Sequence, residues 1–203
     1  MMASKKTYMI AILLLAVCVG IYGLASVKNN GAGEGSRLIV DPYRYLNDYA
    51  ARVQMEARYF LELSQNLNTR SDAFLYTKGY LERNSTDDYF KSVERAMLDA
   101  YEEKDKPVVN QIIGVNNEIN ILIGNLYDYL NRHDDNDFAK KWGDIQKRLQ
   151  AIYPLLVSGS SSDVTLYNVS NNPSEFVNNK ELHVLLEKVS QIINDIYGLI
   201  RSP

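Results

Sequence analysis

The feature that most constrains the fold is a helical spacing of apolar residues that continues through most of the chain after residue 41. It is clearest between residues 107 and 131, where a near-perfect heptad runs through Val108, Ile112, Val115, Ile119, Leu122, Leu126 and Tyr129. Steps of three and four residues place these side chains on one face of an α-helix. No segment alternates apolar and polar residues in the way a half-buried strand does. The pattern therefore predicts an all-α domain.

Capping residues followed by proline mark two helix starts, at Asp41-Pro42 and at Asp105-Lys106-Pro107. Apolar stripes predict helices at 42–66, 106–131, 138–156 and 180–200, and helical character between residues 71 and 101. That last stretch breaks at 83–86 and is either two helices or one kinked helix. The stripes of the helices at 138–156 and 180–200 are Phe138, Trp142, Ile145, Leu149, Ile152 and Leu156, and Leu182, Leu185, Val189, Ile192, Ile196 and Leu199.

The helix beginning near residue 106 is the most apolar, because four further residues widen its stripe: Ile113, Ile121, Ile123 and Leu130. We therefore expect it to be central and to touch several neighbours. Short connections predict an up-and-down bundle of four or five helices over residues 41–203. An irregular segment at about 158–179 interrupts it and is long enough for a crossover.

The run Tyr8–Ala25 is apolar and uncharged, and its eighteen residues approach the length needed to span a bilayer. Lys5 and Lys6 precede it, which favours a cytoplasmic N-terminus. We expect residues 1–25 to form an N-terminal transmembrane signal anchor, with the bundle on the extracytoplasmic or lumenal side. The residues that would contact lipid include Tyr8, Leu13, Leu14, Leu15, Val19, Ile21 and Tyr22.

A cleaved secretory signal is the alternative, since Gly23 and Ala25 are small residues at the positions that a signal peptidase requires. The sole cysteine, Cys18, lies inside the apolar run, so the bundle holds no disulfide. Residues 26–40 contain several glycines and no apolar period, and we expect them to form a flexible linker.

The composition after residue 25 argues against nucleic acid as a partner. Removing Lys5 and Lys6 from the 22 basic residues leaves 20, against 25 acidic residues, which gives a net charge of −5. No basic stripe is present for phosphate backbones or anionic lipid.

Residue types that perform chemistry are scattered. His133 and His183 lack a second ligand at metal-binding spacing, and we expect both to face solvent. The acidic run at 134–137 lacks the pattern of an EF-hand, so helix capping explains it better. No nucleophile motif occurs. We therefore expect no enzymatic activity, no metal, no cofactor and no small-molecule substrate.

An asparagine stripe is the most informative surface feature. Asn110, Asn117, Gly124 and Asn131 recur every seven residues, and Asn120 flanks them. An uncharged face with a glycine lets a neighbour approach and hydrogen-bond. We expect this face to contact the 158–179 segment or another protein chain, unless it only reflects a general preference for asparagine.

Together these features predict a non-enzymatic, single-pass membrane protein whose helical bundle contacts other proteins, including further copies of this chain. A structural or assembly role in a cell-envelope complex or in a membrane-containing virion fits this description. The alternative is an extracytoplasmic ligand-sensing domain that works with a separate transducing subunit. A secreted enzyme or binding protein would require cleavage of the N-terminal segment.

Overall fold

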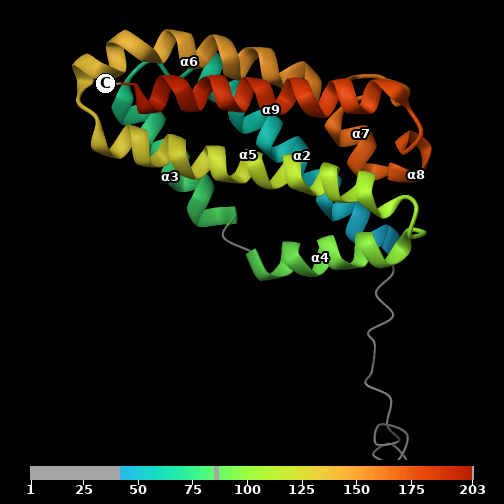
Figure 1. Ribbon diagram of the computed structural model, residues 1–203. Coiled ribbons are helices and arrows are strands. Elements are labelled where there is room, and N and C mark those ends of the chain that lie inside the picture. The colour runs from blue at the N-terminus through green and yellow to red at the C-terminus, as the bar shows by residue number, and fades with distance from the viewer. Residues whose placement is uncertain (1–41, 85–86, 203) are drawn as a thin grey trace, which may run out of the picture. The chain divides into compact units, whose positions relative to one another are not determined.

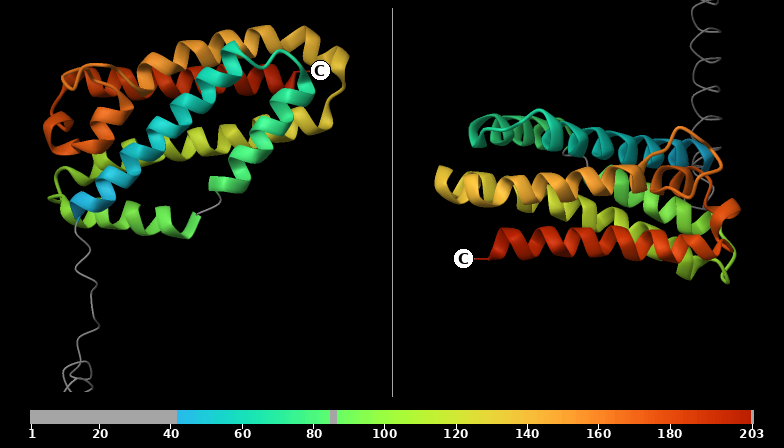
Figure 2. Two further views of the ribbon diagram at one scale, coloured as in Figure 1. Left: turned by 180° about the vertical axis from the view of Figure 1, so that it is seen from behind. Right: turned by 90° about the horizontal axis from the view of Figure 1, so that it is seen from above.

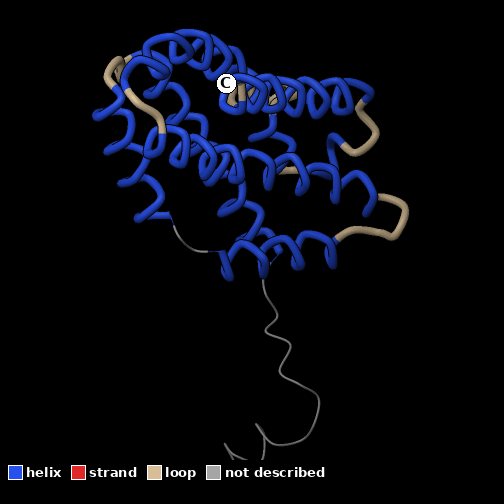
Figure 3. The backbone as a smooth tube through the Cα atoms, turned by 60° about the vertical axis from the view of Figure 1, so that its left-hand side comes forward, coloured by secondary structure: helices blue, strands red, loops and turns tan. Residues whose placement is uncertain are grey.

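The computed structural model describes residues 42–84 and 87–202, with all their side chains except those of 42–46, 87–90 and 174. These residues belong to one compact unit, Val40–Pro203. All regular structure among them is helical (Figure 3), which confirms the predicted all-α bundle. The predicted anchor at Tyr8–Ala25 and the linker at 26–40 lie outside the described residues. Among the helices that are described, none is both long and apolar enough to cross a membrane.

The described helices follow the predicted order along the chain. They are α2 Pro42–Gln65, α3 Arg70–Asn84, α4 Asp87–Ala100, α5 Lys106–Arg132, α6 Asp135–Leu156, α7 Leu166–Asn171, α8 Pro173–Phe176 and α9 Lys180–Arg201. The region from 71 to 101, which the sequence left open, therefore forms two helices, α3 and α4.

Helix α5 lies centrally and packs against α3, α4 and α9 (Figure 1), as its apolar stripe predicted. The buried members of its heptad are Ile112, Val115, Ile119, Leu122, Leu126 and Tyr129. Ile121 is different, because 59% of it is exposed. Its assignment to the buried stripe was wrong: it points about 100° away from Leu122 around the helix, toward a side where a pocket opens.

Helices α6 and α9 complete the core: α9 packs against both α5 and α6, and α6 also packs against α2. Helix α6 runs antiparallel to α5, and α9 runs antiparallel to α6 (Figure 1). The predicted stripe of α6 is buried throughout, at Phe138, Trp142, Ile145, Leu149, Ile152 and Leu156. Helix capping at the acidic run is confirmed. The Asp134 carboxylate accepts hydrogen bonds from the backbone N–H groups of Asn136 at 3.0 Å and Asp137 at 2.9 Å.

The segment at 158–179 was expected to be irregular, but it contains the short helices α7 and α8. Helix α7 begins where the Thr165 side chain accepts a hydrogen bond from the backbone of Asn168. Leu166, Val169 and Phe176 are buried, and α7 packs mainly against α2. The segment covers one end of the bundle, and α9 then returns along α6 (Figure 1).

Helices α2, α3 and α4 have different neighbours, which opens a space among them. Helix α2 packs mainly against α6 and α7, α3 packs against α5, and α4 packs against α2 and α5. Seen from behind, α2 and α3 diverge from their connection and α4 returns toward the start of α2, so that the three outline a triangle (Figure 2).

Tyrosine rings fill part of the space between α2 and α3. The ring of Tyr59 stacks on Tyr76 with centroids 5.7 Å apart, and it lies 4.5 Å from the ring of Tyr80. The Tyr59 hydroxyl hydrogen-bonds with Thr77 Oγ1 at 2.9 Å, and both residues are buried. Aromatic rings thus bridge two helices that diverge too far for close backbone packing.

Candidate binding groove

Two adjoining pockets open where α2, α3, α4 and α5 meet. The first, of about 590 Å³, we call the inner pocket; all four helices line it, through Arg52, Met55, Tyr80, Leu81, Asn84, Lys91, Glu94, Asn117, Asn120, Ile121 and Ile123. The second, of about 460 Å³, we call the tyrosine pocket; α2 and α3 line it, through Met55, Arg58, Tyr59, Leu75, Tyr76, Gly79, Tyr80, Arg83 and Asn84. Met55, Tyr80 and Asn84 belong to both, so the two pockets form one continuous groove.

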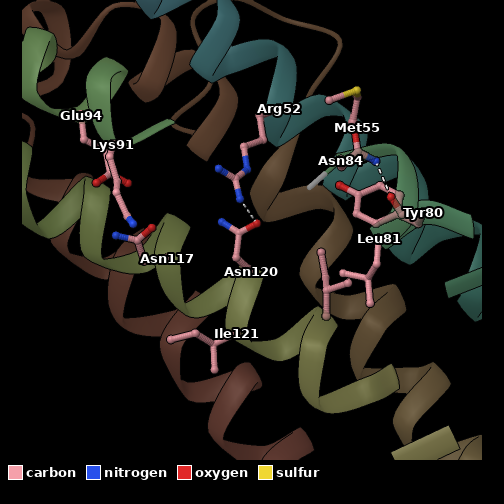
Figure 4. Close-up of a pocket in the computed structure, with 11 residues that line it drawn as sticks. Arg52, Met55, Tyr80, Leu81, Asn84, Lys91, Glu94, Asn117, Asn120 and Ile121 are labelled. Carbon is pink, nitrogen blue, oxygen red and sulfur yellow. Dashed lines mark hydrogen bonds between the residues drawn. The ribbon is translucent and has the colours of Figure 1, made fainter. Parts of the chain in front are cut away.

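Arg52 connects two helices at the inner pocket. Its side chain extends from α2 toward Asn120 on α5, and its guanidinium donates a hydrogen bond to Asn120 Oδ1 (Figure 4). Arg52 Nε also donates to Glu56 Oε1 at 3.1 Å. Asn120 Nδ2 in turn donates to the carbonyl oxygen of Asn116 at 2.9 Å. These contacts hold the Arg52 side chain in one position at the pocket.

Behind Arg52, the carboxyl group of Glu56 is completely buried. Loss of hydration raises the pKa of Glu56 to about 7, and the adjacent Arg52 only partly opposes this effect. Burial also raises the pKa of Tyr49 well above its ordinary value, with the carboxylates of Glu94 and Glu56 acting in the same direction. The inner pocket therefore lies against a buried cluster of ionisable groups.

The structure places the predicted asparagine face partly at this pocket. Asn117 and Asn120 line the inner pocket, and a hydrogen bond from Asn117 lowers the pKa of Glu94, although burial raises it overall. Asn110 and Asn131 are exposed, and Gly124 is half-buried.

The asparagine face was also expected to contact the 158–179 segment. That contact is made by Asn116, which precedes Asn117 in the sequence. Asn116 is buried, and its Nδ2 donates to the carbonyl oxygen of Ile112 at 3.0 Å and to Ser170 Oγ on α7 at 3.4 Å.

The tyrosine pocket combines aromatic, aliphatic and cationic side chains. Tyr59, Tyr76 and Tyr80 form one wall, and Met55 and Leu75 are 42% and 60% exposed at its edge. Arg58 and Arg83 add positive charge, and its lining contains no Asp or Glu. A Cβ atom placed on Gly79 would meet nothing within 4 Å, so the pocket has free space above this glycine.

Exposed hydrophobic side chains gather at the groove. Among the described residues, the large hydrophobic side chains with high exposure are Met55, Leu75, Tyr76, Ile121 and Val184. The first four line the inner or the tyrosine pocket. Sequence reasoning missed Leu75, Tyr76 and both arginines. The available signal was the irregular pattern at 71–84, where apolar residues do not keep to one helical stripe.

The groove offers hydrogen-bond donors, positive charge and apolar surface, which are the elements of a binding site. In the part of the chain that the structure describes, no three His, Cys, Asp or Glu side chains are grouped to hold a metal ion. His183 is exposed as predicted. His133 is half-buried instead, because its ring packs on Tyr129 and its Nδ1 lies 3.0 Å from the Tyr129 carbonyl oxygen.

Comparison with known proteins gives no family for this chain: no protein-family model matches it, and no curated protein or solved structure does so either.

Proposed function

We propose that this chain is a non-enzymatic, membrane-anchored helical bundle that acts as a structural or assembly component by contacting another protein through the groove. The observation that carries the proposal is the concentration of exposed Met55, Leu75, Tyr76 and Ile121 around two adjoining pockets. Single exposed hydrophobic residues are ordinary on protein surfaces, whereas a cluster of them is typical of an interaction site.

The bundle is suited to present such a surface. The lining of the groove belongs to helices, and the central helix α5, which neighbours hold on several sides, lines its inner pocket. A surface on rigid helices loses little conformational entropy when a partner binds. Tyrosine and arginine, both present here, are the residues most often enriched where binding energy concentrates.

Membrane attachment in this proposal rests on the sequence. The apolar run at Tyr8–Ala25 and the preceding Lys5 and Lys6 support a single-pass anchor with its N-terminus in the cytoplasm. The bundle then lies on the extracytoplasmic or lumenal side, where the groove meets its partner. Anchoring also concentrates the bundle near partners in the same membrane.

Photo-crosslinking in native membranes tests this proposal. A photoreactive amino acid replaces Leu75, which is 60% exposed at the groove, or Val184, which is 50% exposed on α9 and lines neither pocket. The two side chains are comparably accessible, so Val184 controls for random capture. We expect a discrete protein adduct from position 75 and none from position 184. Equal adducts from both positions, or none from position 75, would contradict a partner in the groove.

Ligand sensing is the second candidate function, and the inner pocket favours it. Its volume of about 590 Å³ lies within the range of small-molecule sites, and Arg52 and Asn120 supply fixed polar groups beside apolar Ile123. Native mass spectrometry of the chain purified from its own membrane checks this function. A bound compound that is lost in Asn120→Leu but kept in Asn131→Leu would support sensing. A compound-free protein that crosslinks from position 75 would support assembly.

A further inference from the structure

The tyrosine pocket has a charge that is opposite to that of the chain as a whole. Arg58 and Arg83 are its only charged lining residues, although the chain carries 25 acidic and 22 basic residues. Both arginines are exposed, and within the described residues neither makes a hydrogen bond or an ion pair. Several other arginines of the bundle are paired, such as Arg70 with Asp135 at 2.6 Å and Arg132 with Asp128 at 3.3 Å, although exposed Arg95 on α4 makes no such contact in the described part of the chain either.

The same pocket that these arginines line contains an apolar recess. Gly79 leaves space above α3, and the recess is bordered by the rings of Tyr59 and Tyr80 and by the thioether of Met55. A recess of about 460 Å³ lined by aromatic rings accepts a large apolar side chain. A guanidinium group binds a carboxylate through two parallel hydrogen bonds, so each arginine is suited to an Asp or Glu beside that side chain.

We propose that the tyrosine pocket binds an acidic segment of another protein, which inserts one large apolar side chain above Gly79 and pairs its flanking carboxylates with Arg58 and Arg83. This inference rests on the proposed function and adds the chemistry of the partner. Charge complementarity selects an acidic partner over a basic one, and it also accelerates association. A concave recess fits an inserted side chain, whereas a bilayer surface is met by side chains that protrude.

Gly79 provides a blocking variant with little risk to the fold. In Gly79→Leu the new side chain enters the free space of the pocket, and leucine favours helix more than glycine does. Gly143→Leu is the matched control, because Gly143 is an exposed glycine within α6 whose added Cβ would also meet nothing within 4 Å. Gly143 lines neither pocket.

The arginines are tested by reversing their charge. Arg58→Glu with Arg83→Glu places two carboxylates opposite the acidic segment, while the double lysine variant keeps the positive charge. Arg95→Glu is the control for net charge, because Arg95 is exposed on α4 and lines neither pocket.

The readout is the adduct from position 75 of the full-length chain in native membranes, with the crosslinked stretch sequenced by mass spectrometry. We expect a stretch with a Leu, Phe, Met or Trp between acidic residues. A fluorescent synthetic peptide of that stretch should bind at least tenfold more weakly to the Gly79→Leu chain and to the double glutamate chain. Gly143→Leu and Arg95→Glu should bind as the unaltered chain does, and the double lysine chain should bind within threefold.

The outcomes separate this inference from the proposed function. An adduct whose peptide lacks acidic residues, or binds equally to the double glutamate chain, overturns the inference and leaves the proposed function standing. An adduct to a second copy of this chain or to lipid also overturns it. Absence of any adduct at position 75 contradicts the proposed function itself.

Discussion

The buried carboxyl group of Glu56 should make the stability of the bundle depend on pH. Burial raises the pKa of Glu56 from 4.5 to about 7 in the folded chain, while the unfolded chain exposes this group to water. Below pH 4.5 both states hold the proton, so Glu56 adds no pH dependence there. Between 4.5 and 7 the unfolded state alone loses the proton, and rising pH therefore lowers the free energy of unfolding.

The size of this effect follows from the two pKa values. At about 1.4 kcal/mol for each tenfold change in proton affinity, the difference between 4.5 and about 7 amounts to about 3 kcal/mol. Most of it, about 2–3 kcal/mol, falls between pH 5 and pH 8. Glu56→Gln has nearly the same shape and no charge at any pH, so its free energy of unfolding should lack this component.

Urea unfolding of the full-length chain in detergent measures the effect at pH 5, 6, 7 and 8. Fluorescence of Trp142 reports unfolding, because it is the single tryptophan of the chain and is only 3% exposed. Glu187→Gln, which changes an exposed carboxylate on α9, is the control. The pKa of Glu94 is also raised. Because all three proteins contain Glu94, its contribution cancels when their free energies of unfolding are compared. If the unaltered chain and Glu56→Gln show the same decline from pH 5 to pH 8, Glu56 does not titrate as its burial implies.

Three further tests probe a buried hydrogen bond, core packing and helix capping, each measured as the free energy of unfolding in urea. Thr77→Val should destabilise by about 1–2 kcal/mol, because it leaves the buried Tyr59 hydroxyl without its partner; adding Tyr59→Phe should recover most of this loss, and an additive double variant would contradict the assigned hydrogen bond. Leu149→Ala removes a completely buried side chain of α6 and should cost about 2–5 kcal/mol. The exposed Ile121→Ala should change stability by about 0.5 kcal/mol or less, and an equal loss from both would refute the assigned burial. Asp134→Ala removes the N-cap of α6 and should cost about 1 kcal/mol, whereas Asp134→Ser should keep most of the stability.

The extent to which the sequence predicted the fold depends on how local each signal is. The α6 stripe from Phe138 to Leu156 was predicted residue by residue, because a helix that packs on one side repeats every three to four residues. On α9 the prediction was confirmed for Leu182, Leu185, Val189 and Ile196. Ile192 and Leu199 are only half-buried, and Ile193 is buried instead of Ile192. Helix starts at Pro42 and Lys106 were also readable, since proline is favoured in the first turn of a helix. Asp105 precedes α5 as predicted, but its side chain makes no capping hydrogen bond.

The 158–179 segment was harder, because its order comes from contacts that are distant in sequence. Helix α7 has only six residues, too few to be stable alone, and buries Leu166 and Val169 in the bundle, where it packs mainly against α2. Nothing within the segment indicates that α2 will supply this surface. Ile121 is the converse case: its neighbours in sequence belong to the core, yet none of the described helices covers its side of α5.

The groove itself was beyond prediction, since it arises from the divergence of α2 and α3 and not from any motif. Two of its residues do not serve the folding of the isolated chain. Leu75 exposes 60% of an apolar side chain to water, and Gly79 within α3 costs about 1 kcal/mol relative to alanine although a Cβ there would clash with nothing. Stability alone would favour a polar residue at the first position and alanine at the second. Gly143 and Val184 depart from the same rule away from the groove. What distinguishes the tyrosine pocket is that exposed Leu75, open Gly79 and the two arginines Arg58 and Arg83 line one recess, which is the combination that the proposed partner requires.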